Sequence, residues 1–160
     1  MSLKICYRYF VYSFLFIFFH LTNKHFNNFP SQGFTIPEIC TKTGKSHFYR
    51  SNIWLGPADV VSPCHYDPFQ NVLCQVIGSK RVILYSPSDS EYLYPARGTV
   101  QKNTSLVDIE NPDYARFPNF GKARALVADL HAGDMLFIPY KFWHFTRSTS
   151  TSCSLNFWWL

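Results

Sequence analysis

Apolar and polar residues alternate in short runs from residue 51 to the end of the chain, a pattern that predicts strands. Residues that favour turns separate these runs. The run at 71–77 stops at Gly78-Ser79 and the run at 81–85 leads back, which predicts a hairpin. Many short strands with one long insertion favour a sandwich or a barrel. The predicted strands cover residues 52–55, 60–67, 71–77, 81–85, 126–130, 135–138, 142–146 and 153–159.

Two short helical segments are predicted between the strands that end at residue 85 and begin at residue 126. Ser86-Pro87-Ser88 opens a helix-like segment near residues 89–92. Residues 95–124 form a long connection in which Asn111-Pro112-Asp113 has the residue types of a helix start: a capping Asn, Pro at the first position and an acid at the next. The helices are therefore expected to be minor elements.

The start of the chain has a different pattern. Residues 10–19 are almost entirely apolar, but Arg8 and His20 limit the apolar run to about half of the roughly 20 residues that a membrane helix needs. A secretory signal would end in a small-residue cleavage site, and the following LTNKHFNNFP offers none. A third interpretation is a segment of the soluble domain, or one not native to the fold. All three stay open, with membrane association through residues 5–22 as the alternative that is not favoured.

Residues 23–50 are polar and contain Asn, Pro and Gly, which predicts a loop-rich connector. We therefore divide the chain into an atypical apolar segment and connector, 1–50, and a folded domain, 51–160. The full length of 160 residues corresponds to about one domain. Aromatic residues make up 19% of the chain, which strengthens the bias toward strands.

Charge and cysteine content exclude several classes of protein. The net charge of +5 comes from scattered Lys and Arg residues without a basic helix or dense run, so nucleic acid is not expected as the direct ligand. The sequence has five cysteines, an odd number, and no C-x-x-C motif. Both observations disfavour a disulfide framework or a structural zinc site. Free thiols favour a reducing compartment, the nucleus or the cytoplasm.

Three polar residues stand out as candidate metal ligands. His65 and Asp67 lie two positions apart on a predicted strand, so their side chains point to the same side. His144 follows another predicted strand that can return it to the same space. Two imidazoles and one carboxylate on one face of a metal suit iron(II) and leave positions for a chelating co-substrate and O2. An isolated H-x-D motif is common by chance, so the hypothesis depends on His65, Asp67 and His144 together. His47 and His131 are expected at the surface and not as metal ligands.

Residues 51–160 resemble the Jumonji-C (JmjC) domain of iron(II)- and 2-oxoglutarate-dependent oxygenases, specifically its subfamily of small JmjC hydroxylases and lysine demethylases. The segments that carry the resemblance are NIWLGPADVVSPCHYDPFQNVLCQVIGSKRVILYSP, LVDIENPD followed by FPNF, AGDMLFIPYKFWHF and SLNFWW, in this order. The resemblance makes 51–160 the catalytic domain. It implies an all-β fold with minor helices, a double-stranded β-helix of the cupin or jelly-roll kind.

By this resemblance His65, Asp67 and His144 are the iron ligands and catalytic residues. Lys80 corresponds to the lysine that pairs with the distal carboxylate of 2-oxoglutarate. Ser62 and Asn71 correspond to a hydroxyl and an amide that bind the same co-substrate. Strict alternation would put Ser62 on the opposite side of the strand from His65, so we expect a bulge at the intervening proline.

The resemblance also implies the remaining walls of the pocket. Asn156 and Trp158 correspond to residues along the far wall, in contact with the cofactors, and Trp54 to an aromatic residue at the mouth. The cofactors implied are Fe(II), the co-substrate 2-oxoglutarate and O2. The expected substrate is a side chain of a protein or peptide, such as a histone or a ribosomal or regulatory protein. Arginine or lysine hydroxylation and methyl-lysine demethylation both fit, and the narrowing tryptophans favour hydroxylation.

The chain departs from the family upstream of residue 51. Relatives usually place a tyrosine against the co-substrate on an earlier strand, and Tyr7, Tyr9 and Tyr12 do not align with it. We therefore expect a fold truncated at its N-terminal side, with an unpaired sheet edge and uncertain full activity. Two rival functions stay open: a JmjC hydroxylase that modifies a tRNA base, and an inactive cupin-like binding module. The sequence does not determine the oligomeric state.

Overall fold

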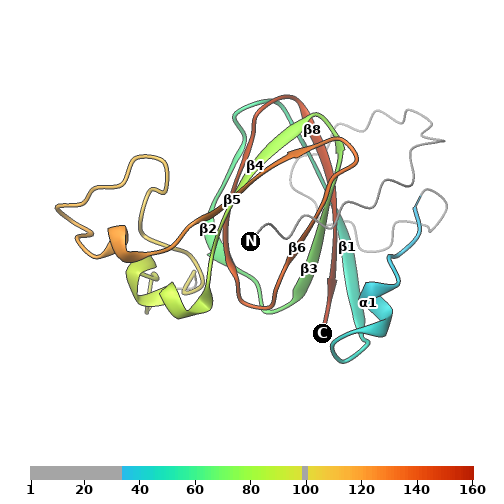
Figure 1. Ribbon diagram of the computed structural model, residues 1–160, viewed down its shortest axis with the longest axis horizontal. Helices are drawn as coiled ribbons and strands as arrows, with labels where there is room; N and C mark the ends of the chain where they lie inside the picture. The colour runs from blue at the N-terminus through green and yellow to red at the C-terminus, as the bar shows by residue number, and fades with distance from the viewer. Residues whose placement is uncertain (1–33, 99–100) are drawn as a thin grey trace.

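Two four-stranded antiparallel sheets face each other in the computed structural model, which describes residues 34–98 and 101–160 (Figure 1). One sheet has the order β1-β8-β3-β6 and the other β2-β7-β4-β5, so neighbouring strands are mostly distant in sequence. This arrangement confirms the predicted all-β, jelly-roll type of fold. The strands are β1 Phe48–Gly56, β2 Val61–Tyr66, β3 Gln70–Ile77, β4 Ser79–Tyr85, β5 Leu126–His131, β6 Met135–Ile138, β7 Trp143–Ser148 and β8 Ser152–Trp159.

Each predicted strand is present, with ends that differ by a few residues. The predicted hairpin at Gly78 is wrong: the chain does turn there from β3 into β4, but the two strands lie in opposite sheets and pair with other strands. Gly78 has a φ of +72°, and a Cβ there would lie 2.0 Å from the carbonyl oxygen of Thr151. Glycine is therefore required at this turn by both conformation and space.

The space between the sheets is only partly apolar. Inward-facing side chains of both sheets form one buried cluster that excludes water from this part of the interior. The rest of the interior is polar and contains the candidate site described below. The buried members of the apolar cluster are Leu73, Val82, Leu84, Leu130, Leu136 and Ile138.

The outer face of the β2-β7-β4-β5 sheet is covered by the long connection between β4 and β5, which Figure 1 shows beside the sheets. Trp143 and Phe145 on β7 pack there against Leu93, Phe117 and Phe120 of the connection. The predicted first helix is the 3₁₀ helix η1, Pro87–Leu93, capped by the Ser86 hydroxyl, which accepts a hydrogen bond from the Ser88 N–H. A second 3₁₀ turn, η2, spans Phe120–Lys122.

The predicted helix start at Asn111-Pro112-Asp113 is wrong. Asp113 Oδ1 accepts hydrogen bonds from the N–H groups of Ala115 and Arg116, and the Phe117 N–H bonds to the Asp113 carbonyl, but the chain makes only a turn. Pro118 follows directly, and a proline inside the next turn would remove a helical hydrogen bond and clash with the preceding carbonyls.

The outer face of the other sheet is covered by residues that were predicted to be a connector. Phe34 contacts Phe157 edge-on at 5.5 Å, and Cys40 of the short helix α1, Ile39–Lys42, is fully buried against the same face. The described part of the predicted connector therefore packs on the sandwich. The apolar run at 10–19, the 5–22 membrane interpretation and the N-terminal tyrosines lie outside the described residues.

Within the described residues β1 pairs with β8 alone, so β1 is an edge strand. No helix of this part of the chain is long and apolar enough to cross a membrane.

Candidate functional site

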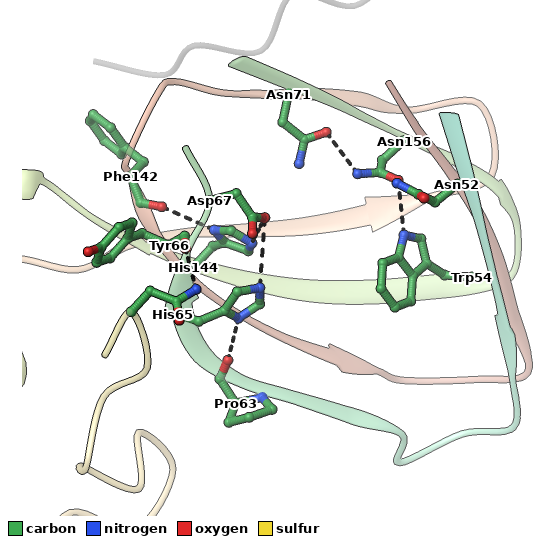
Figure 2. Close-up of polar contacts among 11 residues, drawn as sticks. Asn52, Trp54, Pro63, His65, Tyr66, Asp67, Asn71, Phe142, His144 and Asn156 are labelled. Atoms are coloured by element: carbon green, nitrogen blue, oxygen red, sulfur yellow. Dashed lines mark hydrogen bonds and ion pairs between the residues drawn. The ribbon is translucent and has the colours of Figure 1, made fainter. Parts of the chain in front are cut away.

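His65, Asp67 and His144 converge at one end of the space between the sheets (Figure 2). His65 on β2 lies directly opposite His144 on β7, and Asp67 follows β2 by one residue. The carboxylate Oδ2 of Asp67 is 3.8 Å from His65 Nε2 and 3.5 Å from His144 Nε2. One donor atom from each residue lies within 4.8 Å of the other two, and no other such group of three is found among the described residues.

Both imidazoles are held with the Nε2 atom facing the shared point. His65 Nδ1 lies 2.7 Å from the Pro63 carbonyl oxygen, and His144 Nδ1 lies 3.1 Å from the Phe142 carbonyl oxygen. A carbonyl oxygen can only accept a hydrogen bond, so each Nδ1 carries a proton, and in the neutral ring the lone pair is then on Nε2. This second hydrogen bond orients a histidine for metal binding.

The protonation states of the group also suit a cation. Burial lowers the pKa of His65, and the neighbouring His144 lowers it further, against the smaller opposing effects of Pro63 and Asp67. Burial raises the pKa of Asp67, but the hydrogen bond and charge of His144 outweigh it, so the carboxyl pKa lies below its ordinary value. A neutral imidazole and an ionised carboxylate are the forms that bind metals.

A bulge in β2 brings Ser62 to the same side as His65, as predicted. Ser62 pairs with Thr146 and His65 with His144, so Pro63 and Cys64 together oppose one residue of β7. The extra residue shifts the alternation of the strand by one position. Both Ser62 and His65 therefore line the same pocket.

Lys80 is the cation of this pocket. The alternation of β4 buries Lys80 with Val82 and Leu84, and only 8% of Lys80 is exposed. Burial lowers the pKa of Lys80, and the only charge that raises it comes from the Cys153 thiol. Among the described residues Lys80 makes no ion pair with a carboxylate, so its ammonium group is available to an anionic ligand.

Asn71 and Asn156 line the pocket on the β1-β8-β3-β6 sheet, and Asn52 of β1 supports them from behind by a hydrogen bond to Asn156 (Figure 2). Asn156 Nδ2 donates to Asn71 Oδ1 over 3.3 Å, while Asn156 Oδ1 accepts from Asn52 Nδ2 at 3.0 Å and from Trp54 Nε1 at 3.1 Å. These bonds fix the orientation of the Asn156 amide. They leave the Asn71 amide nitrogen as a donor toward the pocket.

Trp158 lies beside this wall, and Phe69 stacks on it with ring centres 5.3 Å apart. The Trp158 Nε1 atom is buried and has no hydrogen-bond partner among the described residues. A buried donor without an acceptor costs free energy, which a ligand that accepts its hydrogen bond would recover.

Every residue that the sequence predicted for the site lines this one pocket. Three further lining residues were missed: Leu73, Ile138 and Thr146. Thr146 has a signal in the sequence, because it lies two positions after His144 on the same strand. The predicted site residues that line the pocket are Trp54, Ser62, His65, Asp67, Asn71, Lys80, His144, Asn156 and Trp158.

The residues of the pocket fit iron(II) and an anionic co-substrate. The donor set is two imidazoles and one carboxylate on one side of a common point, the set typical of non-haem iron(II) sites. The open side of the group faces the pocket that contains the unpaired Lys80. A chelating anion could therefore contact both a metal and a cation.

The described cysteines do not form a competing soft-metal site. Cys40, Cys64, Cys74 and Cys153 are free thiols. Burial raises the pKa of Cys64 and Cys74 to about 12, which keeps these thiols protonated.

The cupin-like domain family model matches residues 19–160. Lysine-specific demethylase 8 of Danio rerio is 45% identical over 125 residues, which cover 78% of this chain and 31% of the relative. Jumonji C domain-containing protein 5 of Drosophila melanogaster is 42% identical over 127 residues, covering 78% and 32% respectively. Human tRNA wybutosine-synthesizing protein 5 is 44% identical over 95 residues, covering 59% and 29%.

The chain thus spans about a third of the length of these curated relatives. The matched region includes the metal-ligand group and all the pocket walls, since the family model extends over every described strand. The chain belongs to the cupin-like domain family and is similar to its JmjC members.

Proposed function

We propose that the chain is an iron(II)- and 2-oxoglutarate-dependent oxygenase that acts on a side chain of a protein or peptide. The observation that carries the proposal is the group His65, Asp67 and His144 opening into a pocket that contains the buried, unpaired Lys80. Relatives named as lysine-specific demethylases and JmjC proteins support the same class of activity.

His65 and His144 would bind iron through Nε2, and Asp67 through its carboxylate. When bound, iron(II) would let O2, the oxidant, convert 2-oxoglutarate to succinate and CO2 and a C–H bond of the substrate to C–OH, so that each product receives one oxygen atom of O2. The protein keeps both imidazoles in the binding tautomer through the Pro63 and Phe142 carbonyls, and keeps the carboxylate ionised. These contacts form the site before any ligand arrives.

Lys80 would neutralise the distal carboxylate of 2-oxoglutarate, with the Ser62 hydroxyl and the Asn71 amide as further donors. All three side chains lie in the pocket that the metal group opens into. A buried anion with a fixed cation and several donors avoids the large cost of an unpaired buried charge. Trp158 Nε1 offers one more donor on the same wall.

The substrate would enter past Trp54, which is 46% exposed at the pocket, and Trp158 would narrow the space beyond it. This narrowing favours hydroxylation of an arginine or lysine side chain over demethylation of methyl-lysine. The partner would be a protein such as a histone or a ribosomal or regulatory protein. Free thiols favour the nucleus or cytoplasm as its location.

The decisive assay measures succinate formed from 2-oxoglutarate by purified protein with and without Fe(II). We expect iron-dependent turnover in the wild type and none in His65→Ala. The exposed His131→Ala serves as the matched control and should keep full turnover. Mass spectrometry of treated peptides then separates the reactions: a stable gain of oxygen supports hydroxylation, and loss of a methyl group refutes it.

A second candidate is hydroxylation of a tRNA base, favoured by the 44% identity to human tRNA wybutosine-synthesizing protein 5 and by the net charge of +5. Tight RNA binding that weakens steeply with salt would support it. An inactive cupin-like module is the third possibility. Metal binding without succinate production would identify it.

A further inference from the structure

Two loops at the same end of the sandwich bond to each other next to the metal-ligand group. The β2–β3 loop, taken as residues 67–70 so that it includes the first residue of β3, contains Asp67 and Gln70. The loop between β6 and β7, residues 139–142, leads to His144. The Lys141 N–H donates to the Asp67 carbonyl oxygen over 3.1 Å. The neighbouring Tyr140 N–H donates to the side-chain Oε1 of Gln70 over 3.0 Å. Gln70 thereby provides the only side-chain acceptor in the described contacts between these two loops.

The 139–142 loop is a tight and strained turn. The Phe142 N–H bonds to the Pro139 carbonyl at 3.0 Å, which closes the turn. Lys141 has a φ of +59°, a left-handed conformation that costs a residue with a Cβ about 1 kcal/mol or more. Such a conformation persists where surrounding bonds determine it. The N–H groups of both central residues of this turn bond to the β2–β3 loop.

The turn also sets the orientation of a candidate ligand. The Phe142 carbonyl at its end accepts the Nδ1 proton of His144. A continuous bonded path thus connects Gln70 and Asp67 through the turn to the imidazole of His144 (Figure 2 shows its last contact). Loss of the first bond would free the turn to shift, and the carbonyl would shift with it.

We propose that Gln70 is a positioning residue that fixes the separation and orientation of His144 relative to Asp67. The inference rests on the proposed iron site. Gln70 does not line the pocket and touches neither ligand side chain, so its effect passes through the turn. Tyr140 is 44% exposed, so water can bond to its N–H when Gln70 is removed. The expected effect is therefore large on metal binding and small on stability.

Co(II) titration of the metal-free protein, followed by visible absorption, tests the proposal without turnover. Gln70→Met keeps the length of the side chain but removes the acceptor, and we expect Co(II) to bind about 10- to 100-fold more weakly, the range for residues that orient ligands. Gln70→Glu keeps an acceptor oxygen and should bind within about threefold of the wild type. The melting temperature of metal-free Gln70→Met should fall by no more than about 3 °C.

Gln75→Met is the matched control on the same strand. Gln75 is 2% exposed and bonds to Ser152 and Ser154, far along β3 from both loops. Gln75→Met should lower the melting temperature more than Gln70→Met does, because it leaves two buried hydroxyls short of a partner. It should nevertheless leave the Co(II) affinity within about threefold of the wild type. The two variants thus separate stability from positioning.

If Gln70→Met bound Co(II) as tightly as the wild type, the positioning role of Gln70 would be overturned, while the proposed metal site would stand. An equal loss of affinity in Gln70→Glu and Gln70→Met would do the same, because the acceptor would then be irrelevant. Absence of Co(II) binding by the wild type would overturn the metal site itself, and with it the proposed function.

Discussion

Replacing Lys80 by methionine is expected to weaken the binding of 2-oxoglutarate while stabilising the protein that holds no ligand. Methionine fills a similar volume without a charge. Lys80 is 8% exposed, and burial lowers its pKa because no carboxylate of the described residues compensates its ammonium group. The buried charge therefore opposes folding until an anion binds.

The direction of the pH effect follows from the lowered pKa. The unfolded chain binds more protons than the folded protein at pH values between the folded and the ordinary pKa of Lys80. The free energy of unfolding should rise with pH through that interval, and the penalty is fully present below the folded pKa of Lys80. Lys80→Met removes this pH dependence along with the penalty.

The magnitudes can be estimated from the contacts. Removal of a buried, uncompensated charge should stabilise the protein by on the order of 1 kcal/mol, which raises the melting temperature by about 3 °C. Loss of a charge-assisted hydrogen bond to the co-substrate should cost about 1.5 to 3 kcal/mol, or about 10- to 150-fold in affinity.

Thermal unfolding and titration with 2-oxoglutarate in the presence of Mn(II) measure the two effects on one sample. Lys122→Met is the matched control, because Lys122 is exposed at a distance from the pocket and should change neither quantity. A Lys80→Met protein that is less stable and binds 2-oxoglutarate with unchanged affinity would refute the reasoning, since Lys80 would then be a structural residue.

Three further predictions follow from single contacts. Asp67→Asn should abolish Co(II) binding, measured by visible absorption, while the circular dichroism spectrum stays unchanged; binding within about threefold of wild type would contradict the ligand assignment. Glu110→Gln should destabilise the protein at pH 7 and lose this effect as pH falls through the folded pKa of Glu110, which the hydrogen bond from Arg147 holds below its ordinary value; melting curves across pH check this. Gly78→Ala should lower the free energy of unfolding, measured with urea, by about 2 kcal/mol or more, because Gly78 has a left-handed φ and a new Cβ would lie 2.0 Å from the Thr151 carbonyl oxygen. A loss under about 0.5 kcal/mol would show that the turn can relax.

The strands and the convergence of the metal-ligand group could be predicted because both depend on local alternation. Residues i and i+2 of a strand share a side, which was sufficient to pair His65 with Asp67. The bulge was predictable for a similar reason: Ser62 could reach the pocket only if Pro63 broke the alternation. The family resemblance supplied the roles that alternation could not.

The contacts that span long distances in sequence could not be predicted. The helix expected at Asn111-Pro112-Asp113 had correct local signals, but Pro118 ends the turn and Phe117 is buried in the cluster beside the sheet. The acceptor role of Gln70 likewise depends on a turn 70 positions later in the chain. No spacing rule links two such loops before the strands are paired.

The central strands of the sandwich turn polar side chains inward and apolar side chains outward, which is the reverse of the usual pattern. The segments that cover the outer faces of the two sheets are therefore needed to bury apolar surface. The inward side of β8 carries Ser152, Ser154 and Asn156, whereas its outward side carries Leu155 and Phe157. An ordinary exposed sandwich would place the apolar side inward. Much of the apolar surface therefore faces outward, where residues 34–50, 86–98 and 101–124 bury it.

This reversal connects the architecture to the proposed chemistry. A polar pocket between two sheets leaves fewer apolar contacts in the interior. Each asparagine, serine or metal-ligating residue on an inner face occupies a position that a leucine could otherwise fill. The outer clusters around Phe145 and Phe157 supply the burial that the interior lacks. The connection between β4 and β5 also satisfies a main-chain group beside the site, because Ser105 N–H bonds to the Cys64 carbonyl along the free edge of β2. The long connection between β4 and β5 thus stabilises the strand that carries His65, although none of its described residues lines the pocket.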